Sequence, residues 1–200
     1  MIAIVDYGMG NLRSVQKAFE YLGIDARIGS DRALLADASH IVLPGVGAFA
    51  DAAEALRRAG LDEELKRQIA SGKPFLGICL GMQLLFDRSF EDGEHEGLSL
   101  VPGEAVRFDV KDLKVPHIGW NTVRVVKETP LFKGAKDLCF YFVHSYHAAS
   151  VAPDCVETVC EYGCEFVSSV NRGNVFGVQF HPEKSGEAGL ELLKNFGGMA

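Results

Sequence analysis

The first half of the chain alternates short apolar runs with segments of helical periodicity. In chain order these segments cover residues 2–5, 12–22, 40–43, 49–56, 61–69 and 74–79. The first, third and last are short and apolar, as buried strands are, whereas the others repeat apolar side chains at helical spacing. Strands separated by helices run parallel and are joined by right-handed crossovers. This half therefore predicts an α/β fold.

The second half is rich in β-forming residues and ends in one helical segment. The strand-like runs and the final helix cover residues 105–108, 121–126, 139–148, 155–161, 165–170, 175–180 and 187–196. The tetrad Asn171-Arg172-Gly173-Asn174 between two of these runs indicates a hairpin turn. We expect a single domain, residues 1–200, with three layers: an open, mixed but mostly parallel sheet flanked by helices.

Charge and composition argue against several classes of protein. The chain has a formal net charge of −7 and lacks the clustered Lys and Arg that bind nucleic acid. The most apolar run, residues 74–86, is too short to span a bilayer, and the start has no basic leader. Five cysteines, an odd number, indicate a reducing compartment. We expect a cytoplasmic protein that binds neither nucleic acid nor membrane.

The pentapeptide Gly77-Ile78-Cys79-Leu80-Gly81 lies where a predicted strand meets a predicted helix, residues 81–88. This order fits a nucleophile elbow, in which glycines on both sides let a strained turn expose the reactive side chain. A thiol at a helix N-terminus is also favoured as thiolate. A structural cysteine at a glycine-rich strand end explains the pentapeptide equally well, so both readings stay open on these residues alone.

A second motif, VFGVQFHPEKS, follows about a hundred residues later. His181 and Glu183 lie two residues apart, so their side chains project to one side of an extended segment, and Pro182 between them stops strand pairing. A histidine beside Cys79 could accept its proton, while Glu183 could orient the imidazole. Alone, this segment is an ordinary loop. Together with the elbow, it predicts a Cys-His-Glu triad: Cys79, His181 and Glu183.

These motifs resemble those of the class I, or triad, glutamine amidotransferases. The resemblance extends across the chain through DYGMGNL (6–12), LPGVGAF (43–49), PHIGWN (116–121), YFVHSY (141–146) and FHPEKS (180–185). It implies the family's flavodoxin-like fold and hydrolysis of L-glutamine to glutamate and ammonia. PHIGWN and YFVHSY resemble the members that serve histidine biosynthesis, which implies a heterodimer with a (β/α)8-barrel cyclase that receives the ammonia.

The resemblance also implies roles for individual residues. Cys79 would form a glutamyl thioester while His181 moves the proton. The oxyanion would be held by backbone amides of Leu80 and of the turn at Val46 and Gly47, which can rotate into or out of the site. The expected glutamine-binding residues are Gly47, Gln83, Ser145 and Tyr146. The expected contacts with the cyclase are Asn11, Trp120, Tyr141 and Lys184.

Other interpretations are weaker but separable by experiment. Gly8-Met9-Gly10 is similar to a dinucleotide fingerprint, but Arg13 stands where the third glycine belongs. His144, His147, Cys155, Cys160 and Cys164 match no familiar zinc spacing. We therefore expect no metal and no cofactor. A glutaminase for another pathway, such as pyridoxal phosphate synthesis, a catalytically silent binding subunit and a hydrolase of small esters remain alternatives.

Overall fold

The computed structural model describes residues 1–111, 113–135 and 138–199. The helices are α1 (Leu12–Tyr21), α2 (Arg32–Asp37), α3 (Phe49–Arg58), α4 (Leu61–Ala70), α5 (Leu80–Gln83) and α6 (Gly186–Gly197), with 3₁₀ turns η1 (Pro130–Phe132), η2 (Pro153–Cys155) and η3 (Pro182–Lys184). The strands are β1 (Ile2–Val5), β2 (Ala26–Gly29), β3 (His40–Gly45), β4 (Phe75–Cys79), β5 (Arg88–Ser89), β6 (His95–Glu96), β7 (Glu104–Arg107), β8 (His117–Val125), β9 (Cys139–His144), β10 (Tyr146–Ala149), β11 (Val156–Glu161), β12 (Glu165–Arg172) and β13 (Val175–Val178).

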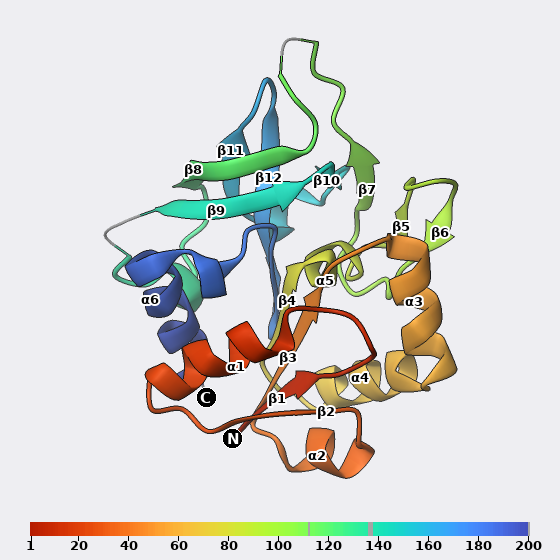
Figure 1. Ribbon diagram of the computed structural model, residues 1–200, viewed down its shortest axis with the longest axis vertical. Helices are drawn as coiled ribbons and strands as arrows, with labels where there is room; N and C mark the ends of the chain where they lie inside the picture. The colour runs from red at the N-terminus through yellow and green to blue at the C-terminus, as the bar shows by residue number, and fades with distance from the viewer. Residues whose placement is uncertain (112, 136–137, 200) are drawn as a thin grey trace.

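One mixed sheet organises the molecule (Figure 1). Its strand order is β2-β1-β3-β4-β13-β12-β10-β7-β5-β6, and β11 leads from β12 to β8 and β9. The strands β2, β1, β3, β4 and β13 are parallel, and the alternation of strands and helices predicted this for β1, β3 and β4. The strands β12 and β13 are antiparallel and joined at the predicted hairpin turn. The expected mixed α/β fold is confirmed.

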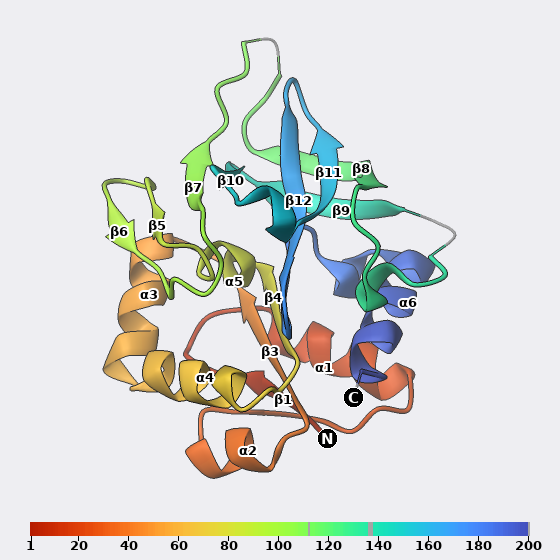
Figure 2. The same ribbon diagram turned by 180° about the vertical axis from the view of Figure 1, so that it is seen from behind.

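Successive side chains of β1 are buried on opposite faces of the sheet, which explains the three layers. Ala3 and Val5 pack into one hydrophobic cluster with side chains of α3 and α4. Ile2 and Ile4 pack into a second cluster with side chains of α1 and α6. Because successive residues of a strand face opposite sides of the sheet, two buried faces require apolar residues at every position. Figures 1 and 2 show α1 and α6 on one side of the parallel strands and α3 and α4 on the other.

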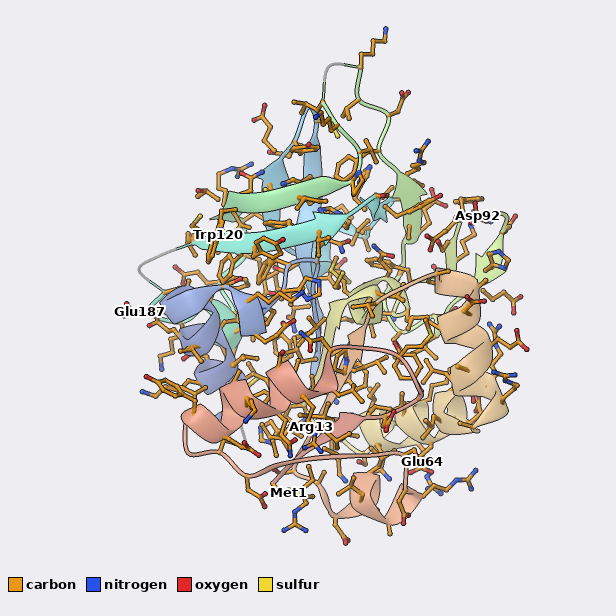
Figure 3. The ribbon with its side chains drawn as sticks, in the orientation of Figure 1. Met1, Arg13, Glu64, Asp92, Trp120 and Glu187 are labelled. Carbon is orange, nitrogen blue, oxygen red and sulfur yellow. The ribbon has the colours of Figure 1, made fainter. Side chains whose placement is uncertain are left out.

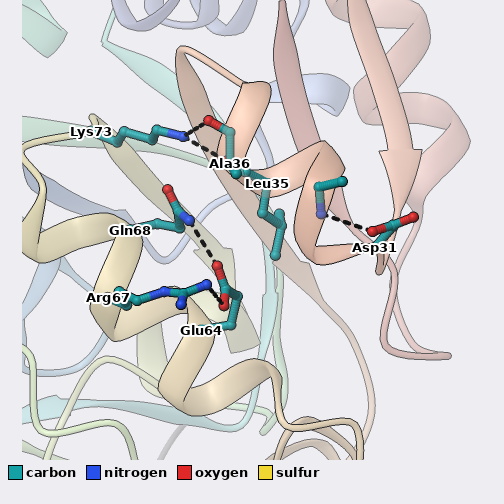
Figure 4. Close-up of polar contacts among 8 residues, drawn as sticks. Asp31, Leu35, Ala36, Glu64, Arg67, Gln68 and Lys73 are labelled. Atoms are coloured by element: carbon teal, nitrogen blue, oxygen red, sulfur yellow. Dashed lines mark hydrogen bonds and ion pairs between the residues drawn. The ribbon is translucent and has the colours of Figure 1, made fainter.

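A buried carboxylate is paired within α4 (Figure 4). The Glu64 side chain forms an ion pair with Arg67 and accepts a hydrogen bond from Gln68 at 2.7 Å. The Arg67 hydrogen bond is the main reason that the pKa of Glu64 lies below its usual range. Beyond the helix, Lys73 donates to the Leu35 carbonyl at the end of α2. The Lys73 contact joins the segment that follows α4 to α2.

The helix predicted at residues 81–88 is wrong beyond its first turn. It ends at Gln83, and the next amides form tighter turns, Leu85 to Met82 and Phe86 to Gln83. Leu84, Leu85 and Phe86 are all fully buried, so successive side chains enter the core instead of following one helical face. The predicted strand 139–148 is also divided, at Ser145, into β9 and β10. Within the described residues, no helix is long and apolar enough to cross a membrane.

Candidate active site

Cys79 ends β4 in a conformation that L-residues rarely adopt, with φ 56° and ψ −110°. The strained turn expected from the two glycines is therefore present. A Cβ at Gly77 would lie 2.5 Å from the Gly81 carbonyl oxygen, and a Cβ at Gly81 would collide with the Leu43 carbonyl oxygen of β3. Both glycines are needed because backbone passes where a side chain would begin. The following helix, α5, has only four residues, so its dipole is small.

The sheet brings His181 and Glu183 to the same edge. Because β13 lies parallel to β4, with Val178 opposite Ile78, the chain leaving β13 emerges beside Cys79. His181 Nδ1 and Glu183 Oε1 are 2.8 Å apart, and both side chains are buried. The His181 carbonyl accepts a hydrogen bond from the Ser185 hydroxyl at 2.6 Å. These contacts fix the imidazole with its other nitrogen, Nε2, buried.

The electrostatic surroundings favour a charged imidazole. Burial by itself lowers the pKa of His181, but contact with Cys79 and Glu183 outweighs it and raises the pKa to about 10. No hydrogen bond of good geometry joins Nε2 to a described atom. We therefore attribute the part of the His181 pKa rise that Cys79 causes to the closeness of the sulfur and the imidazole. At neutral pH the imidazole is therefore charged, beside the Cys79 sulfur.

A cavity of about 450 Å³ opens over Cys79. It is lined by most of the site residues expected from sequence: Val46, Gly47, Cys79, Leu80, Gln83, Ser145, Tyr146, His181 and Lys184. Glu183 contacts His181 from behind and is not part of the lining. Residues from four separate segments thus meet near the carboxyl ends of β3, β4 and β13, where open α/β sheets bind their ligands.

The turn expected to supply an oxyanion donor follows β3. Gly47 has φ 96°, and a Cβ there would lie 2.8 Å from the Met9 side chain. The Tyr7 hydroxyl donates to the Pro44 carbonyl at 3.0 Å. Burial raises the pKa of Tyr7, and the charge of Cys79 raises it further. The loop between β1 and α1 therefore packs directly against this turn.

Sequence reasoning missed several residues of the site. Glu91 lines the cavity, and its Oε2 accepts a hydrogen bond from the Phe49 amide at 2.7 Å. It lies in the connection between β5 and β6, which has no periodic pattern that could have placed it. Gln179 donates from Nε2 to Cys79 Sγ at 3.7 Å. Its position two residues before His181 was the available clue. His144, considered only as a metal ligand, also lines the cavity.

Two of the residues expected at a partner interface, Trp120 and Tyr141, lie opposite each other on β8 and β9, whereas Lys184 also lines the cavity. Trp120 is 58% exposed, which rules out the ordinary core role of a lone tryptophan. Its ring meets Tyr141 edge-on at 6.1 Å, and Lys184 Nζ lies 5.9 Å from the Tyr141 ring centre. Figure 3 shows Trp120 on the side of the molecule away from Asp92. Asn11 lies just before α1, and its side chain makes no capping hydrogen bond.

Comparison with known proteins identifies the family. Residues 3–198 match the family Glutamine amidotransferase class-I. The chain belongs to the class I glutamine amidotransferases. Among the described residues, no group of three or more His, Cys, Asp or Glu could hold a metal ion.

Individual amidotransferases resemble the chain over its full length. It is 53% identical to the imidazole glycerol phosphate synthase subunit HisH of Caldanaerobacter subterraneus, covering 100% of this chain and 98% of that protein. The same-named subunit of Syntrophotalea carbinolica is 50% identical, with 100% of each chain covered. A crystal structure of a glutamine amidotransferase superposes with a TM-score of 0.78 at 19% identity, covering 98% of this chain and 100% of that one. PurLQS from Thermotoga maritima gives 0.78 at 22% identity, covering 98% and 96%. Both structures share the fold.

Proposed function

We propose that the chain is the glutaminase subunit of imidazole glycerol phosphate synthase. It hydrolyses L-glutamine to glutamate and ammonia, and the ammonia passes to a (β/α)8-barrel cyclase that forms imidazole glycerol phosphate and AICAR in histidine biosynthesis. The observation that carries the proposal is the thiol of Cys79 on a strained turn, beside a buried imidazole whose other nitrogen contacts Glu183. The full-length similarity to HisH subunits supports the choice of pathway.

The reaction follows from the protonation states of the site. The Cys79 thiolate attacks the side-chain amide carbon of glutamine, and the oxygen becomes negatively charged. The Leu80 amide and the turn at Val46 and Gly47 line the cavity and supply the donors for this oxyanion. Each such donor is typically worth about 10²–10³ in rate. His181 gives its proton to the departing nitrogen, so that ammonia leaves and a glutamyl thioester remains.

The second half of the reaction regenerates the site. His181, now neutral, accepts a proton from the attacking water, and the thioester collapses to glutamate and the Cys79 thiolate. Glu183 holds the imidazole in one orientation throughout and stabilises its charged form. Both partners are almost completely buried, so their interaction is only weakly screened by solvent.

We assign substrate recognition to the polar groups of the cavity. Gln83, Ser145, Tyr146 and the Gly47 backbone offer uncharged donors and acceptors. Glu91 adds a carboxylate, which complements the α-ammonium group of glutamine. Because Glu91 also accepts from the Phe49 amide, the same carboxylate is anchored at the start of α3.

We assign partner binding to the exposed group of Trp120, Tyr141 and Lys184, together with Asn11. An exposed aromatic beside a cation is typical of the residues that dominate protein interfaces. We also infer that residues 1–200 form one amidotransferase type 1 domain, which the family match over 3–198 supports. A cytoplasmic location stays a prediction, checked by cell fractionation.

The test compares Cys79→Ser with Cys164→Ser, which alters an exposed cysteine. Each variant is combined with the cyclase subunit, and product is measured with glutamine or with added ammonia. Cys79→Ser should lose glutamine-dependent synthesis by at least 10³-fold and keep ammonia-dependent synthesis. Cys164→Ser should keep both. Retention of glutamine use by Cys79→Ser would show that the nucleophile is assigned wrongly.

The pathway is tested with the wild-type chain. Glutamine turnover should rise when the imidazole glycerol phosphate synthase cyclase is added, and should not respond to the synthase subunit of pyridoxal phosphate formation. Stimulation by the second protein alone would move the chain to the other pathway. The absence of turnover with every partner would favour a silent binding subunit.

A further inference from the structure

Gln179 places a buried amide between the nucleophile and a cavity-lining glutamine. The residue follows β13 and is 0% exposed. Its Oε1 accepts from Gln83 Nε2 at 3.1 Å, and its Nε2 donates to Cys79 Sγ at 3.7 Å. A nitrogen–sulfur distance of this size is a hydrogen bond, because sulfur is larger than oxygen. An amide buried without such partners would cost free energy, so both contacts account for its position.

The orientation of the Gln179 amide is fixed by its neighbours. Gln83 Nε2 also lies 3.1 Å from the Tyr146 carbonyl oxygen, which can only accept. The NH₂ group of Gln83 must therefore face both the Tyr146 carbonyl and Gln179, and Gln179 must present its oxygen to that NH₂ group. The nitrogen of Gln179 is then the atom that faces Cys79. Exchange of the two amide atoms would break both contacts at once.

The Tyr146 carbonyl is itself fixed by a pair of histidines. His144 Nδ1 lies 2.8 Å from that oxygen, and its Nε2 lies 3.0 Å from His117 Nδ1. Since the carbonyl is an acceptor, His144 carries its proton on Nδ1 and accepts from His117 on Nε2. A single run of hydrogen bonds thus extends from His117 through Tyr146 and Gln83 to Gln179. It ends on the sulfur.

We propose that Gln179 is a further catalytic residue, whose side-chain N–H donates to the Cys79 sulfur and stabilises the thiolate. The inference rests on the proposed function, because it assigns a role within the same reaction. In the resting site the donated hydrogen bond favours the charged nucleophile over the thiol. In the last step it favours the thiolate as the group that leaves when the thioester breaks down.

Gln179 and His181 act on the sulfur in different ways. His181 both attracts the thiolate and exchanges protons during the reaction, so its effect changes from step to step. The Gln179 amide does not titrate and remains a donor at every pH. Among the described residues, the other titratable groups around the sulfur are Tyr7 beneath the turn, Glu183 behind His181, and the cavity-lining residues Glu91, His144, Tyr146 and Lys184. None of them is altered by a substitution at Gln179.

The experiment measures how fast iodoacetamide alkylates Cys79 as a function of pH. Peptide mass spectrometry separates Cys79 from the other cysteines, so glutaminase activity is not needed for the readout. Two variants remove the donor: Gln179→Met preserves volume, and Gln179→Glu preserves shape. The matched control is Gln68→Met, which alters another buried glutamine, bonded to Glu64 on α4. Thermal unfolding checks that each variant is folded.

The alkylation midpoint should rise by about one pH unit in Gln179→Met, as expected for loss of a hydrogen bond to a charged atom. It should rise further in Gln179→Glu, because a carboxylate beside the sulfur repels the thiolate. Glutaminase kcat should fall about tenfold or more in both variants, and Gln68→Met should match the wild type. If only one of the two Gln179 variants folds, the alkylation midpoint of that variant alone tests the proposal.

Equal midpoints in the wild type and the folded Gln179 variants would overturn this inference and leave the proposed function intact. A wild-type Cys79 that reacts no faster at neutral pH than an ordinary exposed thiol would overturn the proposed function, and this inference with it.

Discussion

At the scale of single residues, the site depends on Cys79 being held in a conformation that its own side chain disfavours. A positive φ costs a non-glycine residue roughly 1–3 kcal/mol, so the surrounding structure must impose it. Gly77 and Gly81 allow this, since neighbouring backbone occupies the space of their missing side chains. The result is a thiol that projects from the end of β4 toward His181.

Gly81→Ala tests this constraint. Its Cβ would collide with the Leu43 carbonyl, and neither backbone segment can move without disturbing the sheet. We expect a loss of at least about 3 kcal/mol in the free energy of unfolding, measured by urea denaturation. The control is Gly23→Ala, where φ is 74° but a side chain would meet nothing within 4 Å. It should lose only about 1 kcal/mol. Equal losses in the two variants would contradict the collision with Leu43 as the reason for glycine at position 81.

At the scale of elements, the sequence predicted the helices and strands whose apolar residues recur at regular spacing. The helices α1, α3, α4 and α6 and the parallel strands between them follow from repeated apolar positions. The strand β2 and helix α2 were missed because both are short and each buries only one residue, so little apolar pattern marks them. The end of α5 was placed too late because a run of buried leucines looks the same in a helix and in a chain that turns into the core.

The same contrast holds for the site. The triad could be predicted because Cys79, His181 and Glu183 occupy local motifs with a mechanical reason for their spacing. Glu91 and Gln179 could not be assigned, because their roles depend on which atoms the fold brings near them. Glu91 reaches the cavity from an irregular connection, and Gln179 acquires its orientation from Gln83.

The β8–β9 pair carries a buried histidine contact that makes stability depend on pH. Burial lowers the pKa of His144 to about 3, and it also lowers the pKa of His117 to about 4. Both histidines stay neutral when folded and take up a proton when unfolded, where the pKa is about 6.5. Their contribution is therefore present above pH 6.5 and is lost as the pH falls toward 3.

His144→Gln should reduce this dependence. Each histidine that is neutral when folded and charged when unfolded contributes about 1.4 kcal/mol per pH unit to the loss. Guanidinium denaturation at several values between pH 4 and pH 6 gives the slope for each protein. The slope of unfolding free energy against pH should be smaller in the variant by about that amount, even if the variant is less stable at pH 7. An unchanged slope would show that His144 is protonated in the folded chain.

At the scale of the whole molecule, the active site and the exposed group around Trp120 lie on connected structure. Trp120 and Tyr141 pair across β8 and β9, and the Tyr141 carbonyl accepts from the His181 amide at 2.9 Å. Lys184 follows the triad within η3 and also lines the cavity. A partner that binds this surface would therefore contact the segment that carries the catalytic base.

Trp120→Ala should weaken binding to the cyclase subunit by about 30-fold or more, as expected for an aromatic residue at the centre of an interface. Isothermal titration calorimetry measures the Kd. The control is Tyr21→Ala, which removes a large side chain that is 80% exposed on α1. Thermal stability of the isolated chain should change little in either variant. Equal affinities for the wild type and Trp120→Ala would remove Trp120 from the interface.

The assigned nucleophile is the sulfur of Cys79, activated by His181. The most direct measurement is to treat the chain with a glutamine-like electrophile and to locate the adduct by peptide mass spectrometry. The account predicts modification at Cys79 alone, prevented by excess glutamine and slowed at least a hundredfold in His181→Asn. Modification of a different cysteine, or the same rate at Cys79 without His181, would contradict it.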